Sequence, residues 1–208
     1  YVDVVASLYG RNNLLDIVSL TAQNVFIPIT VGGGIRSIDD ALKVLRAGAD
    51  KVAVNTSATK RPAIITELAE RFGSQSVVLS VEAVKCSKGD GWEVYTDNGR
   101  EKTGLDVVNW VRQGVSLGAG EIILTSVDKE GTKRGFDEEL VRAVNDSVNI
   151  PVIASGGMGS FADFESVVKS AGASAVAAAH VLHYEELSIA EIKRDAIESG
   201  IAVRPVHA

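Results

Sequence analysis

The chain has 208 residues, of which 46% are hydrophobic and 23% charged; this composition fits one domain over residues 1–208 and excludes a disordered protein. The net charge of −6 argues against a nucleic-acid binder, because no basic surface is available to neutralise phosphates. The single cysteine, Cys86, excludes a disulfide framework within the chain, and no apolar run is long enough to cross a membrane. We therefore expect a cytoplasmic enzyme.

Short runs rich in β-branched residues alternate along the whole chain with longer amphipathic stretches. The runs are nearly continuously apolar, which predicts strands that are buried on both faces. We expect these strands at residues 1–5, 26–31, 51–55, 76–82, 121–126, 150–155 and 174–179. The chain opens inside the first run and without a methionine, so we expect that residues upstream are missing.

The stretches between the runs have helical spacing. Ser37 is a candidate N-cap, and Ile38, Ala41 and Leu45 follow it on one helix face. Similar spacing occurs over residues 62–72, 107–115 and 140–144. Repeated strand–helix units require a parallel sheet, either open and doubly wound or closed. The number of units favours a (β/α)₈ TIM barrel that lacks its first strand and helix.

One connection, residues 85–104, is too long for a simple loop. It contains the alternating run 92–96, followed by Asp97, Asn98 and Gly99, and an Asn-Gly pair at this place predicts a hairpin turn. A hairpin inserted after a barrel strand is expected over the end of the barrel where chemistry occurs, although a surface decoration is the alternative.

Two segments of the chain repeat the same pattern of strand, Gly-Gly, helix, Ala-Gly-Ala and strand. One begins at Gly33 and Gly34, and the other at Gly156 and Gly157. Glycines between a strand and a helix let backbone N–H groups approach an anion closely, and the helix N-terminus adds positive charge. Glycines that only permit tight turns are the alternative. Two such cradles across one barrel mouth predict a ligand with a phosphate at each end.

Several motifs resemble the cyclase subunit family of imidazole glycerol phosphate synthase, from histidine biosynthesis. They include Val-Gly-Gly-Gly-Ile at 31–35, Phe-Gly-Ser-Gln at 72–75, Leu-Thr-Ser at 124–126 and Ile-Ala-Ser-Gly-Gly at 153–157. The resemblance runs from end to end of the chain. It implies a lyase of the phosphate-binding, half-barrel-repeat type, which uses ammonia from a glutaminase partner. The bisphosphorylated ribulosyl substrate would give imidazole glycerol phosphate and an aminoimidazole carboxamide ribotide, with no cofactor.

The same resemblance implies roles for particular residues. One phosphate would be held by Gly34, Asn55 and Thr56, and the other by Gly131, Gly157, Ala179 and His180. Glu130 and Gly156 would belong to the same set of substrate- and phosphate-binding residues. Thr125 and Ser155 would line the substrate site between them. Lys51 and Glu121 would gate ammonia entry at the opposite end of the barrel. Asp50 would lie on the face that docks the glutaminase.

The chain departs from the family at its catalytic carboxylates. The family uses two aspartates, and the one on the fifth strand is replaced here by Glu82, which adds a methylene. The first-strand aspartate is absent, so we expect the chain as written to be impaired. Glu130 replaces an aspartate of the family, and His180 replaces a small hydroxyl residue. Asp3 matches a family aspartate, and we expect it to have a structural or substrate-orienting role here. No cysteine and histidine cluster has metal-ligand spacing.

Three functions remain open on the sequence alone. The first is the histidine-pathway cyclase. The second is a paralogue that supports amidation of surface sugars; its carboxylate pattern can differ, so the glutamate at position 82 is compatible with it. The third is a barrel fragment that binds phosphates without catalysis. Loss of the first strand would expose strand edges, so we also expect self-association.

Overall fold

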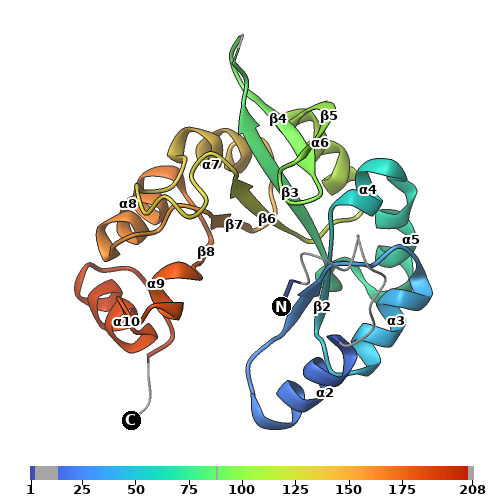
Figure 1. The fold of residues 1–208 in the computed structure, drawn as a ribbon, viewed down its shortest axis with the longest axis horizontal. Helices are drawn as coiled ribbons and strands as arrows, with labels where there is room; N and C mark the ends of the chain where they lie inside the picture. The colour runs from blue at the N-terminus through green and yellow to red at the C-terminus, as the bar shows by residue number, and fades with distance from the viewer. Residues whose placement is uncertain (3–13, 88, 206–208) are drawn as a thin grey trace.

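The computed structural model describes residues 1–2, 14–87 and 89–205. Its centre is a curved, mainly parallel sheet in the order β1-β2-β3-β6-β7-β8, and β4 and β5 form a hairpin attached to β3. The helices lie along the outer side of the arc that the strands make (Figure 1). The prediction of alternating strands and helices of the (β/α) barrel type is confirmed. In the described part of the chain, no helix is long and apolar enough to cross a membrane.

The strands are short apart from β3. They are β1 (Thr30–Gly32), β2 (Lys51–Val54), β3 (Val77–Lys85), β4 (Trp92–Thr96), β5 (Glu101–Asp106), β6 (Glu121–Ser126), β7 (Val152–Ser155) and β8 (Ala175–Ala177). The helices are α2 (Leu14–Asn24), α3 (Ile38–Arg46), α4 (Thr56–Lys60), α5 (Ala63–Phe72), α6 (Val107–Ser116), α7 (Glu138–Asn145), α8 (Phe161–Ala171), α9 (His180–His183) and α10 (Ile189–Glu198). A 3₁₀ turn, Ser74–Ser76, precedes β3.

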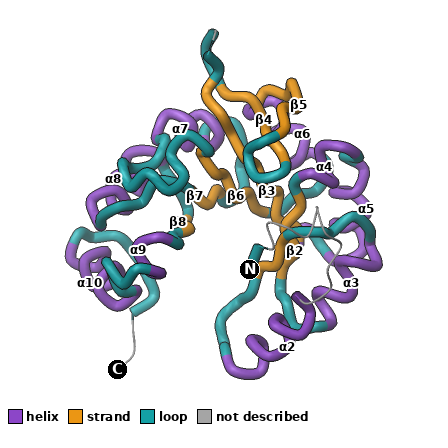
Figure 2. Tube along the Cα trace, viewed as in Figure 1, coloured by secondary structure: helices purple, strands orange, loops and turns teal. Residues whose placement is uncertain are grey.

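The sheet is open over the residues that the structure describes. Val2 forms a parallel bridge with Gly32, which adds the start of the chain beside β1. Within the described ranges, no pairing joins β8 to β1 or to Val2. Figure 2 shows the resulting arc of strands with helices outside it. The rest of the run expected at 1–5, including Asp3, lies outside the described residues.

Local sequence signals explain where several helices begin and end. Ser37 caps α3 by accepting from the N–H of Asp40 at 3.2 Å, as predicted. Capping boxes open α8 and α10, where Ser160 and Ser188 each exchange hydrogen bonds with an acidic residue three positions later. Gly172 ends α8 in the left-handed conformation that suits glycine. The first two N-caps thus fix where α3 begins after β1 and where α8 begins after β7.

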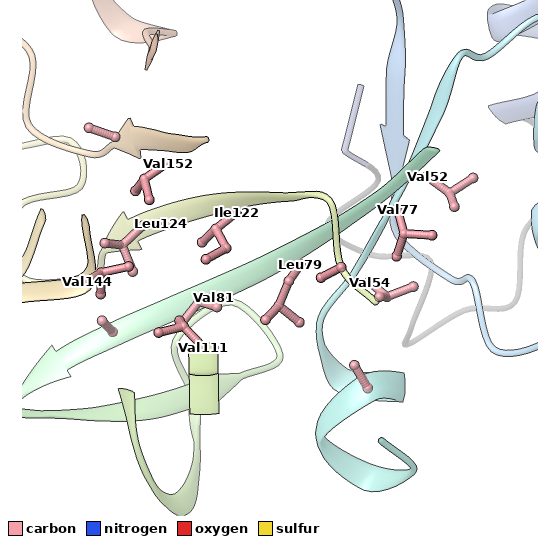
Figure 3. Close-up of a cluster of buried hydrophobic side chains, with 14 of the residues drawn as sticks. Val52, Val54, Val77, Leu79, Val81, Val111, Ile122, Leu124, Val144 and Val152 are labelled. Carbon is pink, nitrogen blue, oxygen red and sulfur yellow. The ribbon is translucent and has the colours of Figure 1, made fainter. Parts of the chain in front are cut away.

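The core lies mainly between the sheet and its helices. Leu79 and Val81 of β3 are fully buried, as are Ile122 on β6 and Val111 on α6 (Figure 3). On β3 the residues that alternate with them beyond Leu79 are only partly buried. β6 and β7 show the same alternation. The prediction that strands are buried on both faces is therefore wrong for these segments, because helices cover one face and the other faces the inside of the open arc.

The predicted strand at 26–31 is also too long. Only Thr30–Gly32 pairs as β1, and Phe26 is 90% exposed. Pro28 has no N–H to donate to a ladder and restricts the residue before it, so the apolar segment ahead of it stays outside the sheet. Ile29 is the first residue here to be buried.

The hairpin is placed by the length of β3. Val77–Leu79 pair with β2, whereas Glu82–Lys85 pair antiparallel with β4. β4 therefore lies on the same side of β3 as β2 does, beyond the carboxyl end of β2. Its chain direction is opposite to that of β3, so β4 runs toward the carboxyl end of β2. The turn between β4 and β5 consequently points at the carboxyl edge of the parallel sheet, while the connection before β4 projects away from the body of the molecule (Figure 1).

Truncating Leu79 tests the core on the helix side of β3. Leu79 is fully buried, so Leu79→Ala leaves a cavity and is expected to lower the free energy of unfolding by about 2–5 kcal/mol. Leu20 on α2 is 64% exposed, and Leu20→Ala is expected to change it by no more than about 0.5 kcal/mol. Urea unfolding of both variants checks this, and equal losses would contradict the assignment of the core.

Candidate functional site

A cavity of about 430 Å³ opens at the carboxyl ends of β1, β2 and β3. Carboxyl ends of neighbouring parallel strands meet at one edge of a sheet, which is where barrel enzymes place their reactive groups. Glycines, hydroxyl groups, cations and two carboxylates share this cavity. Its polar and glycine lining comprises Gly32, Gly33, Gly34, Arg36, Asn55, Thr56, Ser57, Lys60, Arg61, Ser80, Glu82, Asp97 and Asn98.

The first glycine pair faces this cavity. Gly33 and Gly34 have φ values of 97° and 71°, a backbone conformation that L residues rarely adopt. Three cations, Arg36, Lys60 and Arg61, line the same space although the chain carries a net charge of −6. Clustered positive charge beside the backbone N–H groups of a glycine turn attracts an anion. The geometry supports the phosphate cradle predicted at Gly34, which stays a prediction.

Asn55 stands at the junction of β2 and α4. It precedes the first residue of α4, and its side chain hydrogen-bonds to Glu82. The Oδ1 atom of Asn55 is buried and has no hydrogen-bond partner. A buried acceptor without a partner costs free energy unless a ligand or water satisfies it. The amide nitrogen of Asn55 thus donates to Glu82, while its Oδ1 atom remains able to accept a hydrogen bond from a ligand or water.

Glu82 lies on β3 with its carboxylate in the cavity. Its Oε2 atom accepts the N–H of Gly99 at 2.7 Å, across the hairpin turn. Burial raises the pKa of the Glu82 carboxyl, hydrogen bonds from Gly99 and Asn55 oppose that rise, and the charge of Asp97 adds to it. A carboxyl group whose pKa is raised in this way holds its proton closer to neutral pH, which suits a general acid.

The hairpin turn differs from the one predicted. Asp97, Asn98 and Gly99 all have positive φ values, of 52°, 61° and 71°, and the N–H of Arg100 bonds to the carbonyl of Thr96 at 3.1 Å. The turn therefore contains three left-handed residues rather than an Asn-Gly pair alone. Asp and Asn tolerate this conformation better than other side chains do. Because Asp97 and Asn98 line the cavity, the hairpin belongs to the site and is not a surface decoration.

The second glycine pair packs against a loop instead of lining the first cavity. Gly157 accepts the N–H of Gly135 at 3.0 Å, and a Cβ at Gly157 would lie 2.2 Å from the Gly135 carbonyl oxygen. Glu130 lies against Gly156, where an added Cβ would be 3.1 Å from its Oε2 atom. A Cβ at Gly156 would also lie 2.8 Å from the Ser126 carbonyl oxygen, so close backbone approach requires both glycines. Gly131, with φ of 70°, completes this loop.

The two glycine pairs share one edge of the sheet. Glu82, Thr125 and Ser155 are directly paired neighbours near the carboxyl ends of β3, β6 and β7. This row of polar residues runs from the first glycine pair, beyond β1, to the second, beyond β7. The structure places Thr125 and Ser155 in this row and outside the lining of the first cavity, and their role at the substrate site stays a prediction.

His180 sits beyond β8 with a different partner. Ala179 precedes α9, and the Nε2 atom of His180 lies 3.6 Å from Oε1 of Glu186. Lys133 hydrogen-bonds to the same Glu186 oxygen at 2.8 Å and holds the pKa of that carboxyl below its usual range. Two potential cations therefore converge on one carboxylate beside the second glycine loop.

The opposite edge of the sheet carries an ion pair. Lys51 and Glu121 are the first residues of β2 and β6, and their side chains meet at 2.8 Å. Asp50, just before β2, accepts the N–H of Ile29 at 2.7 Å and is exposed. These three residues lie at the amino ends of the strands, as the resemblance implied, while their roles stay predictions.

Sequence reasoning missed several residues of the cavity. Asp97 and Asn98 were assigned to a turn but not to the site, although the expected place of the hairpin above the barrel could have indicated it. The cations Arg36, Lys60 and Arg61 were also missed. Arg36 directly follows Gly-Gly-Ile, and a basic residue close behind a glycine pair is a signal of anion binding.

The comparisons with known proteins agree with this geometry. The family described as histidine biosynthesis protein matches residues 1–188. An imidazole glycerol phosphate synthase subunit HisF from Legionella pneumophila is 66% identical over 164 residues, which cover 79% of this chain and 77% of that protein. A subunit of the same name from Mycobacteroides abscessus is 53% identical over 209 residues, covering 98% and 81%.

A curved parallel sheet with its polar cavity at the carboxyl edge defines the class of (β/α) barrel enzymes. The chain belongs to the histidine biosynthesis protein family, and its relatives place it among the cyclase subunits of imidazole glycerol phosphate synthase. These matches favour the histidine-pathway cyclase over the sugar-amidation paralogue and the non-catalytic fragment.

A substitution at Gly99 tests how tightly the turn is seated. A Cβ at Gly99 would lie 2.7 Å from a methyl group of Val127, whereas a Cβ at Gly104 would meet nothing within 4 Å. Their φ values, 71° and 74°, are nearly equal. Gly99→Ala is therefore expected to lower the free energy of unfolding by about 1–3 kcal/mol more than Gly104→Ala, because only the former adds overpacking. Urea unfolding checks the difference; equal losses would mean that the turn does not pack on Val127.

Proposed function

We propose that the chain catalyses the cyclase reaction on a bisphosphorylated ribulosyl aminoimidazole carboxamide intermediate. The substrate reacts with ammonia to give imidazole glycerol phosphate and an aminoimidazole carboxamide ribotide. The observation that carries this proposal is the shared edge: Glu82 lies in a cavity that also holds Gly34 and three cations, on the same edge as Gly157. Two glycine pairs on one edge are the arrangement that an elongated ligand with a phosphate at each end would require.

Each group of residues at this edge has a separate role in the proposed reaction. The loop at Gly33 and Gly34, with Thr56 and the cations, binds one phosphate, while Gly131, Gly157 and His180 bind the other. Asn55 orients Glu82 and offers its unpartnered Oδ1 to the substrate. Glu82 transfers protons during ammonia addition and ring closure, which require both an acid and a base.

Ammonia is supplied by a glutaminase subunit that docks on the amino edge of the sheet. The ion pair between Lys51 and Glu121, the first residues of β2 and β6, lies at that edge. Asp50 is exposed beside it and is available to a docked partner. A route from this edge to Glu82 would follow the inner face of the sheet.

Turnover of the substrate with ammonium at alkaline pH, followed by absorbance, tests the reaction. Glu82→Gln is expected to lower kcat by about 10²–10⁴-fold, because the amide cannot transfer a proton but can still accept the Gly99 hydrogen bond. Glu101→Gln, an exposed change on β5 of the hairpin, serves as the matched control and is expected to leave kcat unchanged. The expected impairment of the parent chain would lower its kcat without abolishing turnover, so a parent chain that releases no imidazole glycerol phosphate at all would refute the proposal.

Removing Lys51 tests the supply of ammonia. Lys51→Met leaves Glu121 unpaired at the amino edge, and an unpaired, partly buried charge disturbs its surroundings. With the glutaminase present, glutamine-dependent turnover is expected to fall by about tenfold or more, the scale of one lost charged contact. Turnover of Lys51→Met with ammonium is expected to be unchanged. The control, Lys43→Met, alters an exposed lysine on α3 and is expected to leave both the glutamine-dependent and the ammonium-dependent turnover unchanged. Equal losses with both nitrogen sources would contradict a role in supply.

A further inference from the structure

A second carboxylate enters the cavity from the hairpin. Asp97 follows Thr96, the last residue of β4, and lines the same cavity as Glu82. The register places it there: Tyr95 pairs with Glu82, so the chain beyond Tyr95 runs back toward the ends of β2 and β1. Asp97 thus shares the space with the first glycine pair, although it comes from a different part of the fold.

The position of Asp97 is fixed by its neighbours on both sides. Thr96 is buried, and its carbonyl accepts from Arg100 at 3.1 Å. Gly99 donates to Glu82 and packs against Val127. A turn held at both ends in this way keeps the Asp97 carboxylate near the cavity instead of leaving it free in solvent.

We propose that Asp97 and Glu82 form a two-carboxylate proton-transfer pair in this cavity, in which Glu82 starts as the acid and Asp97 as the base. The inference rests on the proposed cyclase reaction and adds Asp97 as a catalytic residue. The surroundings of Glu82 support the division of roles: burial raises the pKa of its carboxyl, the hydrogen bonds from Gly99 and Asn55 oppose that rise, and the negative charge of Asp97 adds to it. Three cations line the same cavity.

The pair accounts for the addition of ammonia to the substrate carbonyl. The nitrogen bonds to the carbonyl carbon, the π electrons move to oxygen, and that oxygen takes the proton of Glu82 as the ammonium nitrogen gives one to Asp97. Water then leaves when the hydroxyl takes the proton from Asp97 and the carbon–oxygen bond breaks. The iminium nitrogen returns a proton to Glu82. Both carboxyl groups end in their starting forms, and ammonia and the carbonyl are exchanged for imine and water.

A turn-forming role for Asp97 makes a different prediction. Asparagine adopts the left-handed conformation as readily as aspartate does, and Asn98 beside it has the same conformation. Asp97→Asn therefore preserves the turn and removes only the charge. Asp90→Asn removes a charge from the exposed connection between β3 and β4 of the same hairpin, outside the cavity lining, and is the matched control.

Two measurements on the parent chain and both variants test the pair. The first is kcat and KM with ammonium across pH. Asp97→Asn is expected to lower kcat by about 100-fold, within the range for loss of one general base, with KM changed by less than about threefold. The second is a carbon-13 NMR titration of the Glu82 carboxyl. Loss of the repelling charge should lower its pKa in Asp97→Asn, so Glu82 loses its proton at lower pH; Asp90→Asn should leave it in place.

The two measurements separate this inference from the proposed reaction. A Glu82 titration that is unchanged in Asp97→Asn overturns the pair, whatever the turnover, and so does a kcat within about threefold of an active parent. A parent without turnover refutes the cyclase reaction; if its Glu82 titration still moves to lower pH in Asp97→Asn alone, the carboxylates are shown to act on each other.

Discussion

The contact on which the site depends is the hydrogen bond between the Gly99 N–H and the Glu82 carboxylate. It joins β3 to the turn of the hairpin, which β3 also holds by antiparallel pairing with β4. The same carboxylate receives the amide of Asn55, so three segments that are distant in sequence converge on one side chain. A hydrogen bond to a charged group is stronger than a neutral one, and here it competes with the cost of burying that charge. The balance leaves Glu82 with its raised pKa.

The one-sided core explains why such a site is possible. Helices bury alternate residues of β3, β6 and β7, and this burial stabilises the sheet independently of what lies on its inner face. Polar residues such as Ser80, Glu82 and Thr125 can therefore occupy the inner positions without weakening the main packing. The candidate site therefore lies on the inner face of the sheet, opposite the face that packs against the helices.

Sequence patterns predicted the order of elements, the hairpin and the two glycine pairs, because each depends on local periodicity or on glycine chemistry. They failed at residues 26–29, where apolar composition suggested a strand that Pro28 prevents. They also failed to assign Asp97 to the cavity, since that placement depends on the register between β3 and β4, which no short motif encodes. The roles of Glu130 and His180, the impaired catalysis and the self-association stay predictions.

The unequal length of β3 has a consequence for how this protein can be altered. β3 extends several residues beyond β1 and β2, and it carries the hairpin on that extension, above the rim that the shorter strands define. The hairpin is nevertheless joined to the core, because Val94 on β4 is fully buried and Trp92 and Leu105 pack against the buried cluster. A designer could therefore change what the cavity accepts by altering the tip at 97–98, while keeping the strand residues of β4 and β5 that the core requires.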